Sequence, residues 1–259
     1  MAAAFEDAIA GDDADVGADP VRPLFRYLFQ ERLRGLLPAG ARVADLACGT
    51  GEDALFLAAR GITVIGFDGA PDRVQRARDQ AEAHGLADRV RFEVGRPEEL
   101  GRRDGPFDGA YCGLRALEDA DLTVVGERLA AALRPGAPVL LCLVGRYPLP
   151  AMIDRALTAR GQTGPERRSR ATTVDARIPT VDAAIEHPTR REAQRRFGTA
   201  FHWRAGFALG VLVPCGSHAA WIERHPLAFG VLAALEGLVR RAPLLRSLGA
   251  YVVLEGVRR

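Results

Sequence analysis

The sequence contains no lysine, so arginine supplies all 35 of its basic residues, against 33 acidic ones. The resulting net charge of +2 is too small to favour nucleic acid as a partner. Cysteine is also scarce, and the cysteines form no Cys-x-x-Cys pair, which argues against a metal site. We expect buried free thiols in a reducing compartment. The four cysteines are Cys48, Cys112, Cys142 and Cys215.

Long hydrophobic runs are missing as well. The apolar segments 207–213 and 227–235 are far shorter than the roughly 20 residues that cross a bilayer. The acidic start lacks the basic and then apolar parts of a secretory signal, so we expect a cytoplasmic protein with no stable membrane insertion. The apolar side chains of residues 227–239, followed by Arg240 and Arg241, could graze a membrane or cover a lipid-like acceptor, but core packing is the preferred interpretation.

The chain is long enough for one sizeable core, with 259 residues of which 48% are hydrophobic. We expect a mobile acidic segment at residues 1–19 and a single domain at residues 20–259. An amphipathic helix with Leu24, Tyr27 and Leu28 on its apolar side should pack on the sheet edge. The pattern predicts further helices over residues 71–84, 119–133, 151–159 and 226–239, and strands over residues 89–94, 138–144, 201–213 and 251–255.

The most informative stretch is residues 43–51, an apolar run with Asp45 in it that breaks into small residues. It predicts a buried strand, a tight turn and a helix, because Gly49 and Gly51 permit backbone angles and close approaches that side chains forbid. Gly61 then ends the helix, and the β-branched run that follows predicts a second strand ending at Asp68.

This strand-loop-helix-strand unit places a ligand at the carboxyl ends of the strands, where an acid about 20 residues further on accepts hydrogen bonds from ribose hydroxyls. Asp68 stands at that position. The glycine run formally satisfies the dinucleotide fingerprint, but Asp45, Glu52 and Asp53 surround the turn with negative charge and repel a pyrophosphate. A ligand with an ammonium and a sulfonium group is not repelled, so S-adenosylmethionine is favoured over NAD or FAD.

With these residues the chain resembles the class I S-adenosylmethionine-dependent methyltransferases of the bacterial small-molecule type. Their first motif matches from Asp45 to Gly51, with Ala47 as a mild change from the first glycine. Asp68 stands where the family holds the ribose, and the runs 106–111 and 133–136 look like the fourth strand and the turn before the fifth. The resemblance implies a doubly wound, Rossmann-like α/β fold, with a mostly parallel seven-stranded sheet and an antiparallel C-terminal strand.

The resemblance also implies a site for S-adenosyl-L-methionine, with one departure. After the third strand the family has Gly-Asp and a small residue, whereas Arg96 here accepts no hydrogen bond and Pro97 donates none. Glu98 or Glu99 could replace these adenine contacts after a small loop shift, or Arg96 could stack on the adenine. The expected cofactor-binding residues are Asp45, Ala47, Cys48, Gly49, Gly51, Asp68, Gly69, Arg96, Pro97 and Cys112.

His187 is the first candidate for a general base. A histidine titrates near neutral pH, and this one stands just ahead of a helix that Thr189 and Glu192 begin with a capping box. The alternative is an ordinary turn residue before Pro188. The resemblance also implies that residues 1–19 could form a lid over the cofactor and that a substrate-side insertion lies at about residues 146–198. The arginine-rich part of this insertion makes an anionic or sugar-bearing acceptor conceivable, although a solvated loop is the preferred interpretation.

The sequence therefore favours methyl transfer to a small-molecule acceptor, with oxygen as the commoner nucleophile. No Asn/Asp-Pro-Pro-aromatic run follows the fourth strand, which disfavours methylation of nucleic-acid bases. Two alternatives remain open. One is a methyltransferase-like binding or scaffold protein without catalysis, motivated by Arg96 and Pro97, and the other is a nucleotide-dependent oxidoreductase. The residues carry no signal for an oligomeric state.

Overall fold

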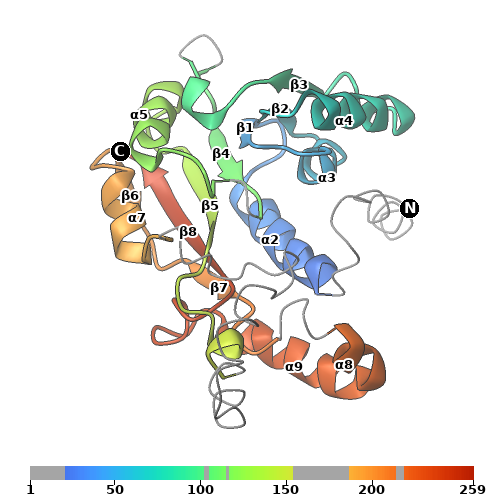
Figure 1. The fold of residues 1–259 in the computed structure, drawn as a ribbon. Coiled ribbons are helices and arrows are strands. Elements are labelled where there is room, and N and C mark those ends of the chain that lie inside the picture. The colour runs from blue at the N-terminus through green and yellow to red at the C-terminus, as the bar shows by residue number, and fades with distance from the viewer. Residues whose placement is uncertain (1–20, 102–104, 115–116, 154–186, 214–218) are drawn as a thin grey trace, which may run out of the picture.

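The computed structural model describes the chain apart from residues 1–20, 102–104, 115–116, 154–186 and 214–218. The expected acidic N-terminal segment, Cys215 and most of the substrate-side insertion therefore lie outside the described residues. The described elements form an α/β arrangement in which one sheet has helices on both faces (Figure 1).

The sheet has the strand order β3-β2-β1-β4-β5-β8-β6. The first five of these strands pair in parallel, and β8 pairs antiparallel with β5. The predicted doubly wound, mostly parallel sheet with an antiparallel C-terminal strand is confirmed. The strands are β1 (Arg42–Leu46), β2 (Thr63–Asp68), β3 (Val90–Val94), β4 (Gly109–Cys112), β5 (Pro138–Val144), β6 (Phe201–Trp203), β7 (Phe207–Leu209) and β8 (Tyr251–Arg258).

The segment predicted as strand over residues 201–213 is divided into two short strands. β6 pairs with one half of β8 and β7 with the other half, so the two occupy the same position in the sheet. Gly206 lies between them at φ +58°, and a Cβ there would lie 2.3 Å from the Val253 carbonyl oxygen. The chain can pass this point because glycine has no side chain. The sheet therefore has eight strands at seven positions.

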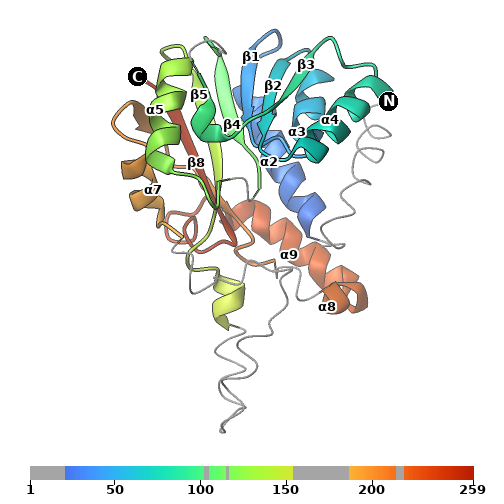
Figure 2. The same ribbon diagram turned by 45° about the horizontal axis from the view of Figure 1, so that its top comes forward.

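Helices on the two faces of the sheet enclose two apolar clusters (Figure 2). β5 serves both of them, because Leu140 and Cys142 belong to one cluster and Leu141 and Leu143 to the other. The helices α2, α3 and α4 pack on the first cluster and α5 and α7 on the second. The helices are α2 (Arg22–Leu36), α3 (Glu52–Ala58), α4 (Pro71–Ala83), the short 3-10 helix η1 (Pro97–Glu99), α5 (Leu122–Ala132), α7 (Arg190–Arg196), α8 (Ala219–Arg224) and α9 (Pro226–Val239).

The packing predicted for α2 is wrong in two respects. Phe25 and Phe29 are buried, whereas Tyr27, expected on the apolar side, is 54% exposed. The helix also lies across a face of the sheet rather than at its edge, because its buried residues share one apolar cluster with residues of β1, β2, β4, β5 and β8. The Arg32 Nε donates a hydrogen bond of 2.8 Å to Glu255 on β8, and α2 also contacts α3, which follows the loop after β1.

Other predicted boundaries shift by a few residues. α5 begins at Leu122 rather than near residue 119, because the Asp121 carboxylate accepts the Thr123 N–H at 2.9 Å and so caps the helix. The fourth strand begins at Gly109, after a single bridge between Phe107 and Leu133. Residues 149–153 are helical, and the rest of the helix expected to end at residue 159 lies outside the described part of the chain.

α9 has the predicted bounds, but the preferred interpretation of its side chains as core holds only for Phe229 and Leu232, which pack against the first apolar cluster. Leu227 and Leu238 are 87% and 77% exposed, and the one fully buried residue of this helix is Glu236. Within the described ranges, no helix is both long and apolar enough to span a bilayer.

Candidate active site

The loop after β1 is tied to the end of β2. The amides of Ala47 and Cys48 donate to the Phe67 carbonyl at 2.7 and 2.9 Å. Gly49 and Gly51 take φ angles of +56° and +87°, in the left-handed region that favours glycine. The predicted strand, tight turn and helix are therefore present, and the turn opens at the carboxyl edge of the parallel strands.

Ala47 also has a positive φ, +89°, and is the one described residue other than glycine that does. An L-residue with a Cβ is strained by about 1–2 kcal/mol in this region. The replacement of the family's first glycine by alanine is therefore not mild. The loop carries this strain because the Ala47 and Cys48 amides are both held by Phe67.

The two glycines of the turn serve different purposes. A Cβ on Gly51 would lie 2.8 Å from the Phe92 ring and 3.1 Å from Ala77, so Gly51 is required for packing of α3 against its neighbours. A Cβ on Gly49 would meet no described atom within 4 Å. Open space above Gly49 is what a ligand cradle at this turn requires.

Asp68 ends β2 beside this turn and is buried. Its Oδ2 accepts the Gly49 N–H at 3.0 Å and its Oδ1 accepts the Ala70 N–H at 2.9 Å. The guanidinium of Arg73, on α4, lies 3.2 Å from the same Oδ1. A carboxylate offers about four acceptor positions, so Asp68 retains capacity for a ribose hydroxyl, and more if Arg73 turns away.

Two of the acidic side chains around the glycine turn interact with α2, so they present less free negative charge than the sequence indicates. Glu52 forms an ion pair with Arg26 of α2. Asp53 accepts a hydrogen bond of 2.8 Å from the Gln30 side chain, on the same helix. The Arg26 guanidinium neutralises Glu52 and its Nε lies 3.9 Å from Asp53, so the negative field at the turn is reduced but not removed.

Asp45 is the third of these acids, and it is buried in the middle of the sheet. It lies opposite Tyr111 in the register of β1 and β4. Burial is the main cause that raises the pKa of Asp45, and the nearby negative charge of Asp53 raises it further. Asp45 thus favours its neutral form more than an exposed aspartate does.

Cys48 and Cys112, both expected to bind the cofactor, are buried. The Cys112 thiol donates a hydrogen bond of 3.0 Å to the carbonyl of Leu46 on β1, so it is directed toward the neighbouring strand. Burial raises the pKa of both thiols, so they stay protonated. Any contact of Cys112 with a ligand at this edge would have to come from its backbone. Cys142 is a buried free thiol as well.

The expected adenine edge contains Gly69, Arg96 and Pro97. Pro97 is buried and starts η1, while the Arg96 Cγ lies 3.7 Å from where a Cβ on Gly69 would stand. Glu99 is turned back onto its own loop, because its Oε2 accepts the Arg96 N–H at 2.9 Å. Glu98 uses Oε1 to accept the Asp121 N–H at 3.1 Å. Its Oε2 is buried and accepts no hydrogen bond from the described atoms.

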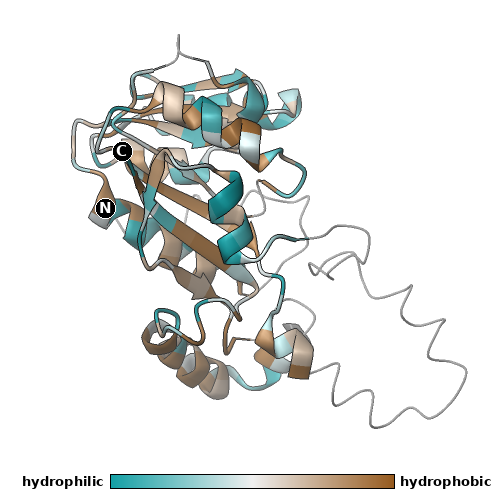
Figure 3. Cartoon of the chain, turned by 90° about the vertical axis from the view of Figure 1, so that its left-hand side faces the viewer, coloured by the Kyte–Doolittle hydropathy of each residue, from teal (hydrophilic) through white to brown (hydrophobic). Residues whose placement is uncertain are grey.

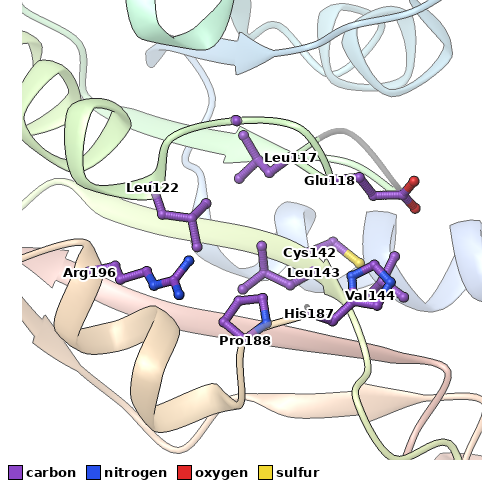
Figure 4. Close-up of a pocket in the computed structure, with 10 residues that line it drawn as sticks. Leu117, Glu118, Leu122, Cys142, Leu143, Val144, His187, Pro188 and Arg196 are labelled. Atoms are coloured by element: carbon purple, nitrogen blue, oxygen red, sulfur yellow. The ribbon is translucent and has the colours of Figure 1, made fainter. Parts of the chain in front are cut away.

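His187 is buried and lines a small pocket at the carboxyl ends of β4 and β5 (Figure 4). Besides the Cys142 thiol of β5, the pocket wall contains three ionisable side chains from separate parts of the chain, namely Glu118 after β4, His187 before α7 and Arg196 at the end of α7. The predicted capping box is present, since the Glu192 carboxylate accepts the Thr189 N–H at 2.7 Å. This cap fixes the start of α7 and therefore the position of His187.

The pocket wall contains none of the residues of the glycine turn. Even so, the two regions are neighbours, because β1 pairs with β4 and β4 pairs with β5. Adjacent strands lie about 4.8 Å apart, so the carboxyl ends of β1 and β5, which are two strand spacings apart, lie on the order of 10 Å from each other. The structure thus brings His187 to the same sheet edge as Gly49 and Asp68, in an adjoining pocket rather than in contact with them.

Several residues of this edge were missed from the sequence. Arg26 and Arg73 supply counter-charges from helices that carry no motif, and neither has a sequence signal beyond its charge. Glu118 and Arg196 reach the pocket through tertiary packing. Tyr111 had a weak signal, since it was expected on the fourth strand, next to the strand that carries Asp45.

Comparison with known proteins agrees with this geometry. Residues 43–136 match the family model of a methyltransferase domain. The 27-O-demethylrifamycin SV methyltransferase of Amycolatopsis mediterranei is 35% identical over 127 residues, which are 48% of this chain and 47% of that enzyme. A ubiquinone biosynthesis O-methyltransferase of Xanthomonas axonopodis is 33% identical, over 52% of this chain and 56% of that enzyme.

The relatives are not all enzymes of small molecules. A 23S rRNA (uracil(1939)-C(5))-methyltransferase of Nitrosospira multiformis is 34% identical over 39% of this chain and 27% of that enzyme. The chain thus spans between about a quarter and a little over half of the length of these three relatives.

Solved structures resemble the chain over a greater length. A protein studied for the conversion of a disulfide bond into a thioacetal group during echinomycin biosynthesis gives a TM-score of 0.51 at 26% identity, over 80% of this chain and 81% of that one. Magnesium protoporphyrin IX methyltransferase from Synechocystis PCC 6803 gives a TM-score of 0.57 at 16% identity, over 100% and 94% of the two chains. At that identity the second likeness supports the fold alone.

Proposed function

Because residues 43–136 belong to the class I S-adenosylmethionine-dependent methyltransferases, we propose that this chain transfers the methyl group of that cofactor to a small-molecule acceptor, with oxygen as the favoured nucleophile. The observation that carries the proposal is the turn at Gly49, which is open above its backbone and tied to Asp68. Residues 20–259 would then form one catalytic domain, with the segment after β5 on the acceptor side.

The residues at the turn fit the cofactor. The space above Gly49 leaves room for a ligand close to the backbone, and Asp68 has acceptor capacity for the ribose hydroxyls. Arg73 competes for one oxygen of this carboxylate. We therefore expect binding to be accompanied by movement of the exposed Arg73 side chain away from Asp68.

The edge of the site that would hold the adenine can also fit the cofactor, but through a different residue from the one in the family pattern. Arg96 and Pro97 offer neither the acceptor nor the donor that the pattern requires. Of the two glutamates that could substitute, Glu99 is engaged by the Arg96 N–H, whereas Glu98 keeps a buried and unused oxygen. We assign Glu98 as the acceptor for the adenine amino group, at a site displaced from the usual position.

The acceptor is assigned to the pocket beside this site. When bound, the cofactor supplies an activated methyl carbon, and the protein aligns the acceptor with it. His187 would accept the proton of the acceptor hydroxyl on an imidazole nitrogen and so act as general base, while the acceptor oxygen would form a bond to the methyl carbon and the bond from that carbon to the cofactor sulfur would break. Arg196 and Glu118 in the same wall would orient a polar or anionic acceptor.

The test is methyl transfer from a radiolabelled cofactor to hydroxyl-bearing small molecules and, in parallel, to ribosomal RNA. We expect label in the small molecules and a loss of about 100-fold or more in kcat for His187→Gln, with cofactor affinity unchanged. The matched control is His84→Gln, at the end of α4, where Nδ1 lies 2.8 Å from the Gln80 carbonyl oxygen. Label in RNA alone would contradict the proposed acceptor.

A second candidate is a methyltransferase-like binding or scaffold protein, favoured by Arg96, Pro97 and the Arg73–Asp68 pair. This candidate predicts that S-adenosylmethionine binds in the millimolar range or not at all. Direct binding measurements therefore separate the two candidates without knowledge of the acceptor.

A further inference from the structure

The outward face of α9 has no charged side chain. The helix contains 14 residues, and Glu236 is its single ionisable side chain. Glu236 is fully buried, on the side opposite to the exposed residues Leu227, Val231, Leu235 and Leu238. These four recur at spacings of four, four and three, which places them on one face of a helix. When the outward face of a surface helix contacts only water, that face normally carries polar residues.

The orientation of α9 is fixed by polar contacts on its inner side. The Glu236 carboxylate accepts the backbone N–H groups of Val211, Leu212 and Val213, the shortest at 2.8 Å. The Arg240 carbonyl accepts the Ala208 N–H at 2.9 Å. A buried carboxylate that loses these partners is costly, so the helix cannot roll to bury its leucines without that loss. The apolar face therefore stays outward.

Basic side chains flank this face. Arg224 ends α8 at one end of α9, and the exposed Arg241 follows its other end. Arg246 follows as well, but it is half-buried and donates a hydrogen bond of 3.4 Å to the Ala205 carbonyl. Glu223 is the one exposed acid among the described residues 219–248, so the net charge around the face is positive. Trp221, on α8, is partly exposed beside it. An apolar strip bordered by arginines, with an indole at its margin, complements a surface that has an apolar interior and negative headgroups.

The position of α9 relates this face to the proposed acceptor pocket. Tyr251 at the start of β8 pairs with Leu209 at the end of β7 and with Val144 at the end of β5. The Val144 end of β5 lines the pocket, and the loop after β7 holds Glu236. α9 therefore lies at the same edge of the sheet as the pocket, and it forms the hydrophobic end of the molecule away from α3 and α4 (Figure 3).

We propose that the outward face of α9, flanked by Arg224 and Arg241, docks the protein on an anionic lipid bilayer. A second copy of the chain is a poorer occupant, because each copy would bring the same net positive border to the interface. The helix is too short to span a bilayer, so the docking is peripheral, with the leucines in the headgroup region and the arginines near lipid phosphates.

The test is flotation of the full chain with vesicles of phosphatidylcholine alone and of phosphatidylcholine with 30 mol% phosphatidylglycerol, without cofactor. We expect flotation with the anionic vesicles and its loss at high salt. The Leu227→Ser/Leu238→Ser double variant should bind at least tenfold more weakly, and Arg241→Gln about fivefold more weakly. Val94→Ser, an exposed apolar position on β3, is the matched control and should bind as the unchanged chain does.

Because both leucines are exposed, the double variant should keep the circular dichroism spectrum and melting temperature of the unchanged protein. Equal flotation of the double variant would overturn the proposal, and so would absence of flotation with anionic vesicles. A dimer that the double variant abolishes, with no vesicle binding, would assign the face to a second copy instead. These readouts need neither cofactor nor acceptor, so they stand or fall separately from the proposed function.

Discussion

The guanidinium of Arg73 lies 3.2 Å from Oδ1 of Asp68, the carboxylate at the end of β2 that also accepts the Gly49 amide. Arg73 is 56% exposed, so the pair is worth little to stability, whereas Asp68 is buried. A ribose diol at this edge would compete with Arg73 for the same oxygen. The ion pair therefore weakens the site for a nucleoside without stabilising the fold.

Removal of this competitor should strengthen cofactor binding. We expect Arg73→Ala to lower the Kd for S-adenosylmethionine about two- to fivefold, which corresponds to the free energy of an exposed ion pair. The measurement is isothermal titration calorimetry, with Arg76→Ala on the same helix as control. A weaker affinity in Arg73→Ala would instead assign Arg73 to the ligand.

Glu98 and Glu99 are adjacent but should behave differently. Glu98→Gln replaces the oxygen that we assign to the adenine amino group, so the Kd for S-adenosylmethionine should rise about tenfold. Glu99→Gln is the matched control, because Glu99 caps its own loop through the Arg96 N–H. The two variants are compared by the same titration. Equal effects of the two substitutions would remove Glu98 from the site.

Ala47 stores strain that a glycine would release. Ala47→Gly should raise the free energy of unfolding by about 1 kcal/mol, because glycine adopts φ +89° without a Cβ clash. Ala83→Gly, at an exposed position of α4, should have the opposite sign and lower it by about 0.5–1 kcal/mol. Chemical denaturation measures both. A destabilised Ala47→Gly variant would show that the loop is not strained there.

Asp45 should make stability depend on pH. Its pKa in the folded protein is raised above the ordinary value of 3.8, so the folded state binds more protons than the unfolded state above that pH. The contribution of Asp45 to stability therefore falls as pH rises from about 4 toward its folded-state pKa. Relative to the unchanged chain, Asp45→Asn should gain stability over this window, by at most about 1.4 kcal/mol per pH unit. Denaturation at several pH values checks this, and a constant difference would contradict it.

The fold was largely predictable because its signals are local. The glycine turn, the strand that ends at Asp68 and the capping box at Thr189 each depend on residues close together in the chain. The bounds of α9 followed from its proline start and apolar run. Which face of α9 meets water did not follow, because the buried Glu236 is held by the amides of residues 211–213, about 25 positions away.

The electrostatics of the site were less predictable, because they depend on tertiary partners. Glu52 and Asp53 were expected to present free negative charge, yet Arg26 and Gln30 reach them from α2. Arg96 and Pro97 were visible as a departure from the family pattern, but the choice between Glu98 and Glu99 required two observations from the structure: Glu99 accepts the Arg96 N–H, and Oε2 of Glu98 accepts no hydrogen bond from the described atoms. The contacts that Glu52 and Asp53 make with α2 join distant segments, and such contacts leave no periodic signal in the sequence.

Titration of the chain with S-adenosylmethionine, S-adenosylhomocysteine and NAD in separate experiments tests the central claim most directly. The account predicts one binding site for S-adenosylmethionine and for S-adenosylhomocysteine, with Kd below about 1 mM, and no heat of binding with NAD. Binding of the two sulfur nucleosides should be at least tenfold weaker in Asp68→Asn and unchanged in Asp72→Asn, on the exposed side of α4. Saturable binding of NAD, with neither sulfur nucleoside bound, would contradict it.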